Sequence, residues 1–126
     1  MGTISYRIDR EKNAVYEKVT GRLTADDMIE HANFMVLEPA HRPGMNFITD
    51  ISEAEIDPSF EMLIELQNHL KQCEFKLGKF RWALIAGDLN NRSAAELYRS
   101  LSALSNGPMV EVFRDQAEAE RWMNLT

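Results

Sequence analysis

The sequence has few of the features that identify a chemistry directly. Cys73 is the single cysteine among 126 residues, which excludes an internal disulfide and any metal site built from several cysteines. No apolar run approaches the roughly 20 residues of a membrane span. There is no glycine-rich phosphate loop and no Gly-x-Ser-x-Gly nucleophile turn. These absences argue against membrane-spanning proteins, nucleotide-phosphate binders and serine hydrolases.

Positive charge is also scarce. Fourteen Lys and Arg residues stand against twenty Asp and Glu, and the resulting net charge of -6 argues against a nucleic-acid partner held by bulk charge. A length of 126 residues with 44% hydrophobic content is typical of one soluble domain, so we treat residues 1–126 as a single unit. The first residues do not form a signal peptide, and we expect a cytoplasmic location.

The apolar pattern predicts alternating strands and helices. Period-two alternation over residues 4–8 and 15–19 predicts a β-hairpin, in which Val15, Glu17 and Val19 share one face. Further strands are predicted at 45–50, 80–87 and 109–113. Helices are predicted to begin near Thr24, Asp57, Asn91 and Asp115, with the second ending near Cys73.

This element order, ββαβαβαβα, predicts an α/β fold. Strands that alternate with helices form right-handed crossovers and a mainly parallel sheet. The hairpin adds one antiparallel strand at or near an edge. We therefore predict a five-stranded mixed sheet flanked by four helices, with Trp82 and Leu84 facing one helical layer and Ala83 and Ile85 the other.

Residues that could carry chemistry are scattered. The three histidines, His31, His41 and His69, belong to different segments, and we predict surface or packing roles for them. Cys73 falls on the apolar side of its helix and is predicted to be a small core residue. A cluster of acids could hold a hard cation and serve a metal-dependent enzyme, or could simply cap a helix and be solvated: Asp50, Glu53, Glu55 and Asp57. We predict no catalytic residue, no cofactor and no metal.

The helix predicted over 57–73 has more apolar residues than one buried face requires. Leu63, Leu66, Leu70 and Cys73 form the stripe expected to face the sheet. Phe60, Met62 and Ile64 lie outside that stripe and predict a ligand or partner surface, with a wide buried face as the alternative. Near the end of this helix, basic and aromatic residues alternate, a pattern that suits an anionic membrane surface or an acidic ligand. An ordinary charged loop between a helix and a strand is the alternative. The residues are Lys71, Phe75, Lys76, Lys79, Phe80 and Arg81.

Several short segments, taken in order, resemble the SpoIIAA-like group of STAS/CRAL-TRIO-type domains over nearly the whole chain. They are Val19-Thr-Gly-Arg-Leu-Thr24, Phe47-Ile-Thr-Asp-Ile-Ser52, Ile56-Asp-Pro-Ser59, Arg81-Trp-Ala-Leu-Ile-Ala86, Val110-Glu-Val-Phe-Arg-Asp115 and Ala119-Glu-Arg-Trp122. The resemblance implies a small, non-catalytic bacterial domain with a SpoIIAA/STAS-like fold.

The two branches of this group imply different partners. STAS anti-sigma-factor antagonists carry Asp-Leu-Ser at a strand end and an Asp-Ser-Ser-Gly turn whose serine is phosphorylated. Asp57 and Ser59 match that turn, while Pro58 and Phe60 replace its first serine and its glycine. Ser59 is thus a candidate phosphorylation site that would regulate binding to a protein. CRAL-TRIO relatives hold lipids in an apolar pocket, which fits Phe60, Met62 and Ile64 better.

Our leading hypothesis is accordingly a non-catalytic binding domain for a lipophilic or amphiphilic small molecule, with a possible association at a membrane surface. Its predicted site consists of Asp57, Ser59, Phe60, Met62 and Ile64. Phosphate or an anionic head group would bind at the helix N-terminus beside Ser59. The alternative hypothesis is a phosphorylation-regulated protein-interaction module. Either function is compatible with a homodimer.

Overall fold

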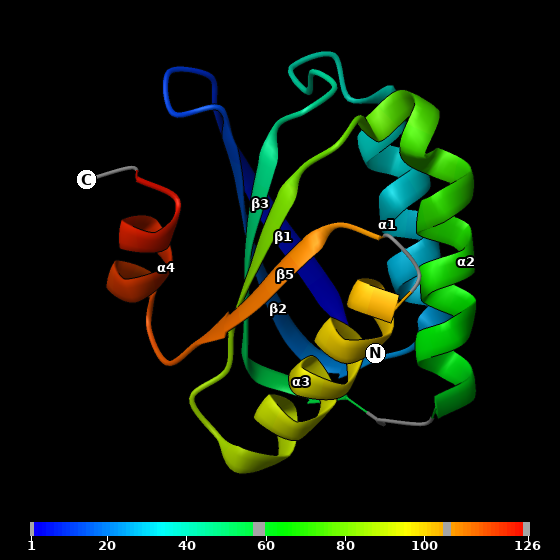
Figure 1. Cartoon of the computed structure of the whole chain (residues 1–126), viewed down its shortest axis with the longest axis vertical. Coiled ribbons are helices and arrows are strands. Elements are labelled where there is room, and N and C mark those ends of the chain that lie inside the picture. The colour runs from blue at the N-terminus through cyan, green and yellow to red at the C-terminus, as the bar shows by residue number, and fades with distance from the viewer. Residues whose placement is uncertain (1, 57–59, 105–106, 125–126) are drawn as a thin grey trace.

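The computed structural model describes residues 2–56, 60–104 and 107–124, without the side chains of residues 60–62 and 75. Its strands are β1 (Thr3–Asp9), β2 (Ala14–Leu23), β3 (Asn46–Ile56), β4 (Arg81–Ile85) and β5 (Met109–Phe113). Its helices are α1 (Ala25–Leu37), α2 (Phe60–Leu77), α3 (Leu89–Leu104) and α4 (Gln116–Trp122). The predicted order of elements is confirmed (Figure 1).

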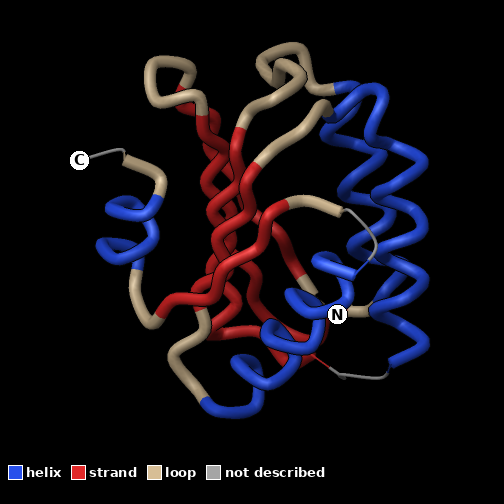
Figure 2. Tube along the Cα trace, in the orientation of Figure 1, coloured by secondary structure: helices blue, strands red, loops and turns tan. Residues whose placement is uncertain are grey.

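The strands form one sheet in the order β1-β2-β3-β4-β5. β1 pairs with β2 in the antiparallel sense, and every other neighbouring pair is parallel. The hairpin therefore supplies an edge strand, as the sequence predicts, and the mixed five-stranded sheet is confirmed (Figure 2).

The strand order determines how the helices are distributed. Each parallel crossover moves one strand further in the same direction, and right-handed crossovers then place α1, α2 and α3 on one face. α4 follows the last strand and lies on the opposite face (Figure 1). The molecule thus has a three-helix face and an α4 face.

Alternation along β4 agrees with the prediction. Trp82 and Leu84 pack into the core of the three-helix face, while Ala83 and Ile85 pack in the cluster that contains Ala119 of α4.

Local sequence signals explain the helix boundaries. The Thr24 side chain accepts a hydrogen bond from the Asp27 N–H, and the Asp27 carboxylate accepts one from the Thr24 N–H, which completes a capping box. Asp115 caps α4 in a similar way, through the N–H of Glu118. The predicted end of α2 near Cys73 is wrong, since the helix continues to Leu77. Gly78 then adopts a positive φ of 74°, which glycine permits.

The third strand is longer than its apolar run predicts. β3 continues beyond Asp50 through polar residues to Ile56, because Thr20–Leu23 of β2 pairs with Glu53–Ile56. The register shifts between Lys18 and Thr20, so β3 has one more residue than β2 across this interval. The acidic segment of the sequence is therefore part of the sheet rather than a loop.

Candidate functional site

A buried carboxylate lies in the middle of the three-helix face. Glu17 belongs to β2 and shares its face with Val15 and Val19, so its side chain enters the core and is 5% exposed. Thr49 stands opposite Glu17 in the β2–β3 register, and its Oγ1 donates a hydrogen bond to Glu17 Oε1 at 2.7 Å. The indole Nε1 of Trp82 donates in turn to Thr49 Oγ1 at 2.8 Å.

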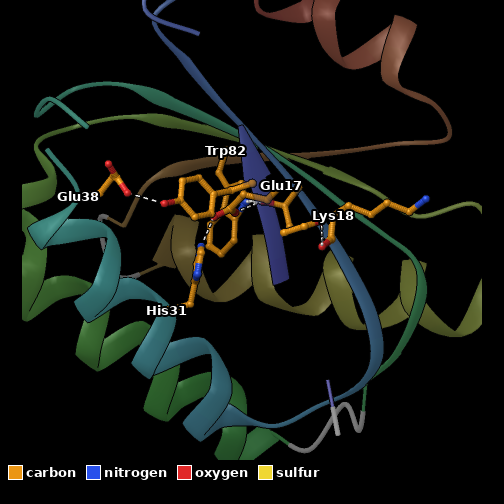
Figure 3. A network of polar contacts seen from close by, with 8 residues as sticks. Glu17, Lys18, His31, Glu38 and Trp82 are labelled. Atoms are coloured by element: carbon orange, nitrogen blue, oxygen red, sulfur yellow. Dashed lines mark hydrogen bonds and ion pairs between the residues drawn. The ribbon is translucent and has the colours of Figure 1, made fainter. Parts of the chain in front are cut away.

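The second carboxylate oxygen of Glu17 contacts a histidine. His31 extends from α1 toward the sheet, and its Nε2 pairs with Glu17 Oε2 (Figure 3). The His31 side chain is 17% exposed, so the pair connects the core to the surface between β1 and α1. Because Nε2 pairs with Glu17, a ligand at His31 would have to use the other ring nitrogen, Nδ1.

Aromatic rings surround His31 on the outer side. Its ring stacks on Phe34, and Tyr6 of β1 meets both rings edge-on. The Tyr6 hydroxyl donates a hydrogen bond to the Glu38 carboxylate. That bond raises the pKa of Tyr6 above its ordinary value and lowers the pKa of Glu38. Tyr6 is thus held as a neutral donor beside His31.

A cavity of about 110 Å³ lies beside the pair. Side chains from β1–β4 and α1–α3 line it, and they are almost all apolar. Glu17, His31, Thr49 and Tyr98 contribute the polar atoms. A buried charge is costly unless it is paired, so a paired carboxylate at an otherwise apolar wall distinguishes this space from ordinary core.

The structure describes only some of the site residues predicted from the sequence. Asp57 and Ser59 lie outside the described residues, so their predicted roles stay predictions. Phe60 and Met62 fall in the first turn of α2, and their side chains are also outside the description. Ile64 is 36% exposed, in agreement with its predicted position away from the buried stripe.

The stripe itself is confirmed. Leu63, Leu66 and Leu70 are buried, and all three line the cavity. Cys73 is half-buried and packs against the same core, where burial raises the pKa of its thiol. The described part of the candidate site thus uses the inner face of α2, and the site predicted at the N-terminal end of this helix stays a prediction.

The described members of the acidic cluster make contacts of other kinds. The Asp50 carboxylate accepts a hydrogen bond from the Ser52 N–H, and Glu53 forms an ion pair with Lys18 at 2.9 Å. Among the described residues, no group of three or more His, Cys, Asp or Glu side chains is placed to hold a metal ion. Asp57, the fourth member, lies outside the described residues.

The histidines differ from one another in their surroundings. His69 forms hydrogen bonds through its Nε2 with Asn33 Oδ1 and Cys73 Sγ. His41 is partly buried beside Phe47. Packing roles suit these two. For His31, however, the predicted surface or packing role misses the buried pairing with Glu17. The sequence does contain a signal for a buried carboxylate, because Glu17 lies on the same strand face as the apolar residues Val15 and Val19.

Comparison with known proteins agrees with this architecture. No protein-family model and no curated protein matches the chain. Among solved structures, an uncharacterized protein from the DUF3478 family of Shewanella loihica PV-4, described as having a SpoIIAA-like fold, matches 98% of this chain and 95% of its own. The TM-score is 0.63 and the sequence identity is 21%. The chain has a SpoIIAA-like fold.

A second solved structure is the anti-sigma factor antagonist SpoIIAA in its unphosphorylated form. It has a TM-score of 0.49 and 12% identity, with 98% of this chain and 97% of that chain covered. The Shewanella protein is described by its SpoIIAA-like fold and not as a CRAL-TRIO domain, so that part of the resemblance stays a prediction. In the part of the chain that the structure describes, no helix combines the length and hydropathy needed to cross a bilayer.

Proposed function

We propose that the protein is a binding domain for a small, largely apolar molecule that carries one polar group. The observation that supports this proposal is the cavity of about 110 Å³ on the three-helix face, with the Glu17–His31 pair in its wall. The apolar part of the ligand would occupy the cavity, and its polar group would bind at His31.

Physical chemistry favours an apolar guest over water in this space. A cavity of about 150 Å³ lined by aliphatic and aromatic side chains stays dry and accepts benzene-sized molecules. Unfilled core space also costs dispersion contacts, which a guest restores. A ligand that binds this cavity only in the folded state therefore stabilises the domain, by an amount that grows with the logarithm of its concentration above Kd.

The neutral amphiphile 1-octanol provides a direct test. We expect saturable chemical-shift changes in the methyl groups of Leu63, Leu66 and Leu84 on titration, accompanied by a rise in Tm. Ala95 is buried and lines the cavity, so Ala95→Leu should fill part of it and weaken binding at least about tenfold.

The matched control is Ala117→Leu, which adds the same side chain to an exposed position of α4. This variant should bind 1-octanol as the wild type does. Unsaturable binding to the wild type, or equal binding by Ala95→Leu and Ala117→Leu, would contradict the proposed function.

Protein binding is a second candidate function, favoured by exposed apolar side chains beside the same site. Phe34 is 48% exposed and Leu37 78%, and Tyr6 contacts Phe34. Such clusters mark interaction surfaces. Sedimentation equilibrium of the wild type against Phe34→Ser with Leu37→Ser tests whether this surface joins two copies. A wild type that stays monomeric at high concentration would contradict a homodimer.

Phosphorylation of Ser59 remains a separate prediction, to be checked by intact-mass measurement.

A further inference from the structure

A second hollow of the molecule lies where β4 and β5 begin. It is a groove of about 580 Å³, lined by α2 between Gln67 and Glu74, by Gly78–Phe80 and by Gly107–Met109. The elements that form it can be followed in Figure 1. Leu70, Phe80 and Met109 provide apolar surface, and Met109 is 62% exposed. This groove is distinct from the predicted site at the N-terminal end of α2.

An unpaired donor is buried in the wall of the groove. Gln67 is 4% exposed, and its Oε1 accepts a hydrogen bond from the Tyr98 hydroxyl at 2.8 Å. Within the described residues, Gln67 Nε2 has no hydrogen-bond partner. A buried N–H without an acceptor is unfavourable, so this atom favours a ligand that brings an oxygen into the groove.

The charges at the groove point to the kind of oxygen. Lys71 and Lys79 line it and are exposed, against one acid, Glu74. This local excess of positive charge occurs in a protein whose net charge is -6. Two ammonium groups and an amide donor suit a carboxylate, which accepts several hydrogen bonds at once.

The groove and the core cavity share a wall. Leu70 and Phe80 line both spaces. A molecule with its anionic end between the lysines can therefore reach the cavity by displacing these two side chains. Both are apolar, so the passage suits a hydrocarbon chain.

The geometry points to a medium-chain carboxylate as the ligand class, with its carboxylate bound by Lys71, Lys79 and Gln67 and its chain passing between Leu70 and Phe80 into the cavity. This inference rests on the proposed function for the apolar part of the ligand, because it uses the same cavity, and it places the polar group at the groove instead of at His31. The cavity has about three quarters of the volume of a benzene-binding cavity of roughly 150 Å³, so it accommodates about four carbon atoms of a chain. Octanoate is a suitable probe, because its other three chain carbons can span the wall between the cavity and the carboxylate.

The test compares octanoate with 1-octanol by calorimetric titration at equal ionic strength. The wild type should bind octanoate about tenfold more tightly than 1-octanol. Lys71→Ala with Lys79→Ala should abolish this preference and leave 1-octanol binding unchanged. The matched control, Arg10→Ala with Arg114→Ala, removes two exposed cations elsewhere and should keep the preference. Thermal unfolding of each variant verifies that it is folded.

Gln67→Met provides an independent check on the buried donor. It should reduce the preference for octanoate, with 1-octanol as the internal reference for an intact cavity.

The possible failures are separable. If 1-octanol binds and responds to Ala95→Leu, but the lysine variant prefers octanoate as much as the arginine control does, the groove inference is wrong and the proposed function stands. If the wild type shows no preference for octanoate, the groove inference is also wrong. If neither compound binds saturably, both are wrong.

Discussion

The three-helix face and the α4 face of the sheet differ in how their side chains fill space. On the α4 face, Ala14, Ala83 and Ala119 are all 0% exposed, which means that small side chains bring the helix close to the strands. On the three-helix face, larger side chains surround a cavity of about 110 Å³ and a buried carboxylate.

The same chain is therefore able to pack tightly around α4, whereas the core cavity described above lies on the face that also contains an ionisable pair. That coincidence favours a binding site over a generally loose core, and the following substitutions test the difference between the faces.

The largest effect is expected at the polar pair. His31→Leu should lower the free energy of unfolding by about 3–5 kcal/mol, because it leaves the Glu17 carboxylate buried without its partner. Glu17→Leu combined with His31→Leu should recover most of this loss, since two apolar side chains need no pairing. Urea denaturation of both variants measures the difference. Equal destabilisation of the single and double variants would show that the pair is not coupled.

Enlarging an alanine should distinguish the two faces. Ala83→Leu adds volume to the tightly packed α4 face and should cost about 1–3 kcal/mol through overpacking. Ala95→Leu places the same volume beside the cavity and should be neutral or stabilising. Thermal and urea unfolding compare them. A larger loss for Ala95→Leu would mean that the cavity does not accept additional atoms.

Arg81 provides a test of how α4 is held in place. Its guanidinium donates hydrogen bonds to the carbonyls of Trp122 and Met123, both at 3.3 Å, and lies over the Trp122 ring. Arg81→Ala should destabilise the domain by about 1.5 kcal/mol. Hydrogen exchange should accelerate in α4, while 1-octanol binding stays unchanged. Faster exchange in α1 or α2 instead would indicate that the two faces are coupled.

The smallest expected effect is a pH dependence at His41. Burial lowers its pKa in the folded state below the ordinary value of about 6.5, because the charged form is poorly solvated. The unfolded chain then takes up this proton first as the pH falls, so stability decreases below about pH 6.5. His41→Gln should lose less stability than the wild type between neutral and mildly acidic pH. Urea denaturation of both proteins at several pH values measures this effect. A difference in their free energies of unfolding that does not change with pH would contradict the prediction.

Much of the fold can be predicted from local patterns. Alternation gives the hairpin, and Thr24 and Asp115 give two helix starts. The end of β3 cannot be found in this way, because Glu53–Ile56 is a strand by virtue of pairing with Thr20–Leu23. Local polarity there indicates a loop, and the neighbouring strand overrides it.

The candidate site is harder to predict because its members are separated in the sequence. Glu17 and His31 meet only when α1 crosses back over β2, and Thr49 joins them through the β2–β3 register. The in-phase position of Glu17 does reveal that a carboxylate enters the core. What it pairs with, and the space left beside it, depend on the packing of three helices.

The strand order has a consequence for how the chain acquires its structure. Each strand lies beside the strand that precedes it in the sequence, from β1 to β5. Every new βα unit can therefore dock on an edge that is already complete, without waiting for a distant segment. Partners in the parallel pairs are separated by 28 residues (Arg81 with Met109) to 35 residues (Phe47 with Trp82), so each docking step must first close one crossover. No pairing step has to close a longer loop than that, and α4, which follows the last strand, covers the second face.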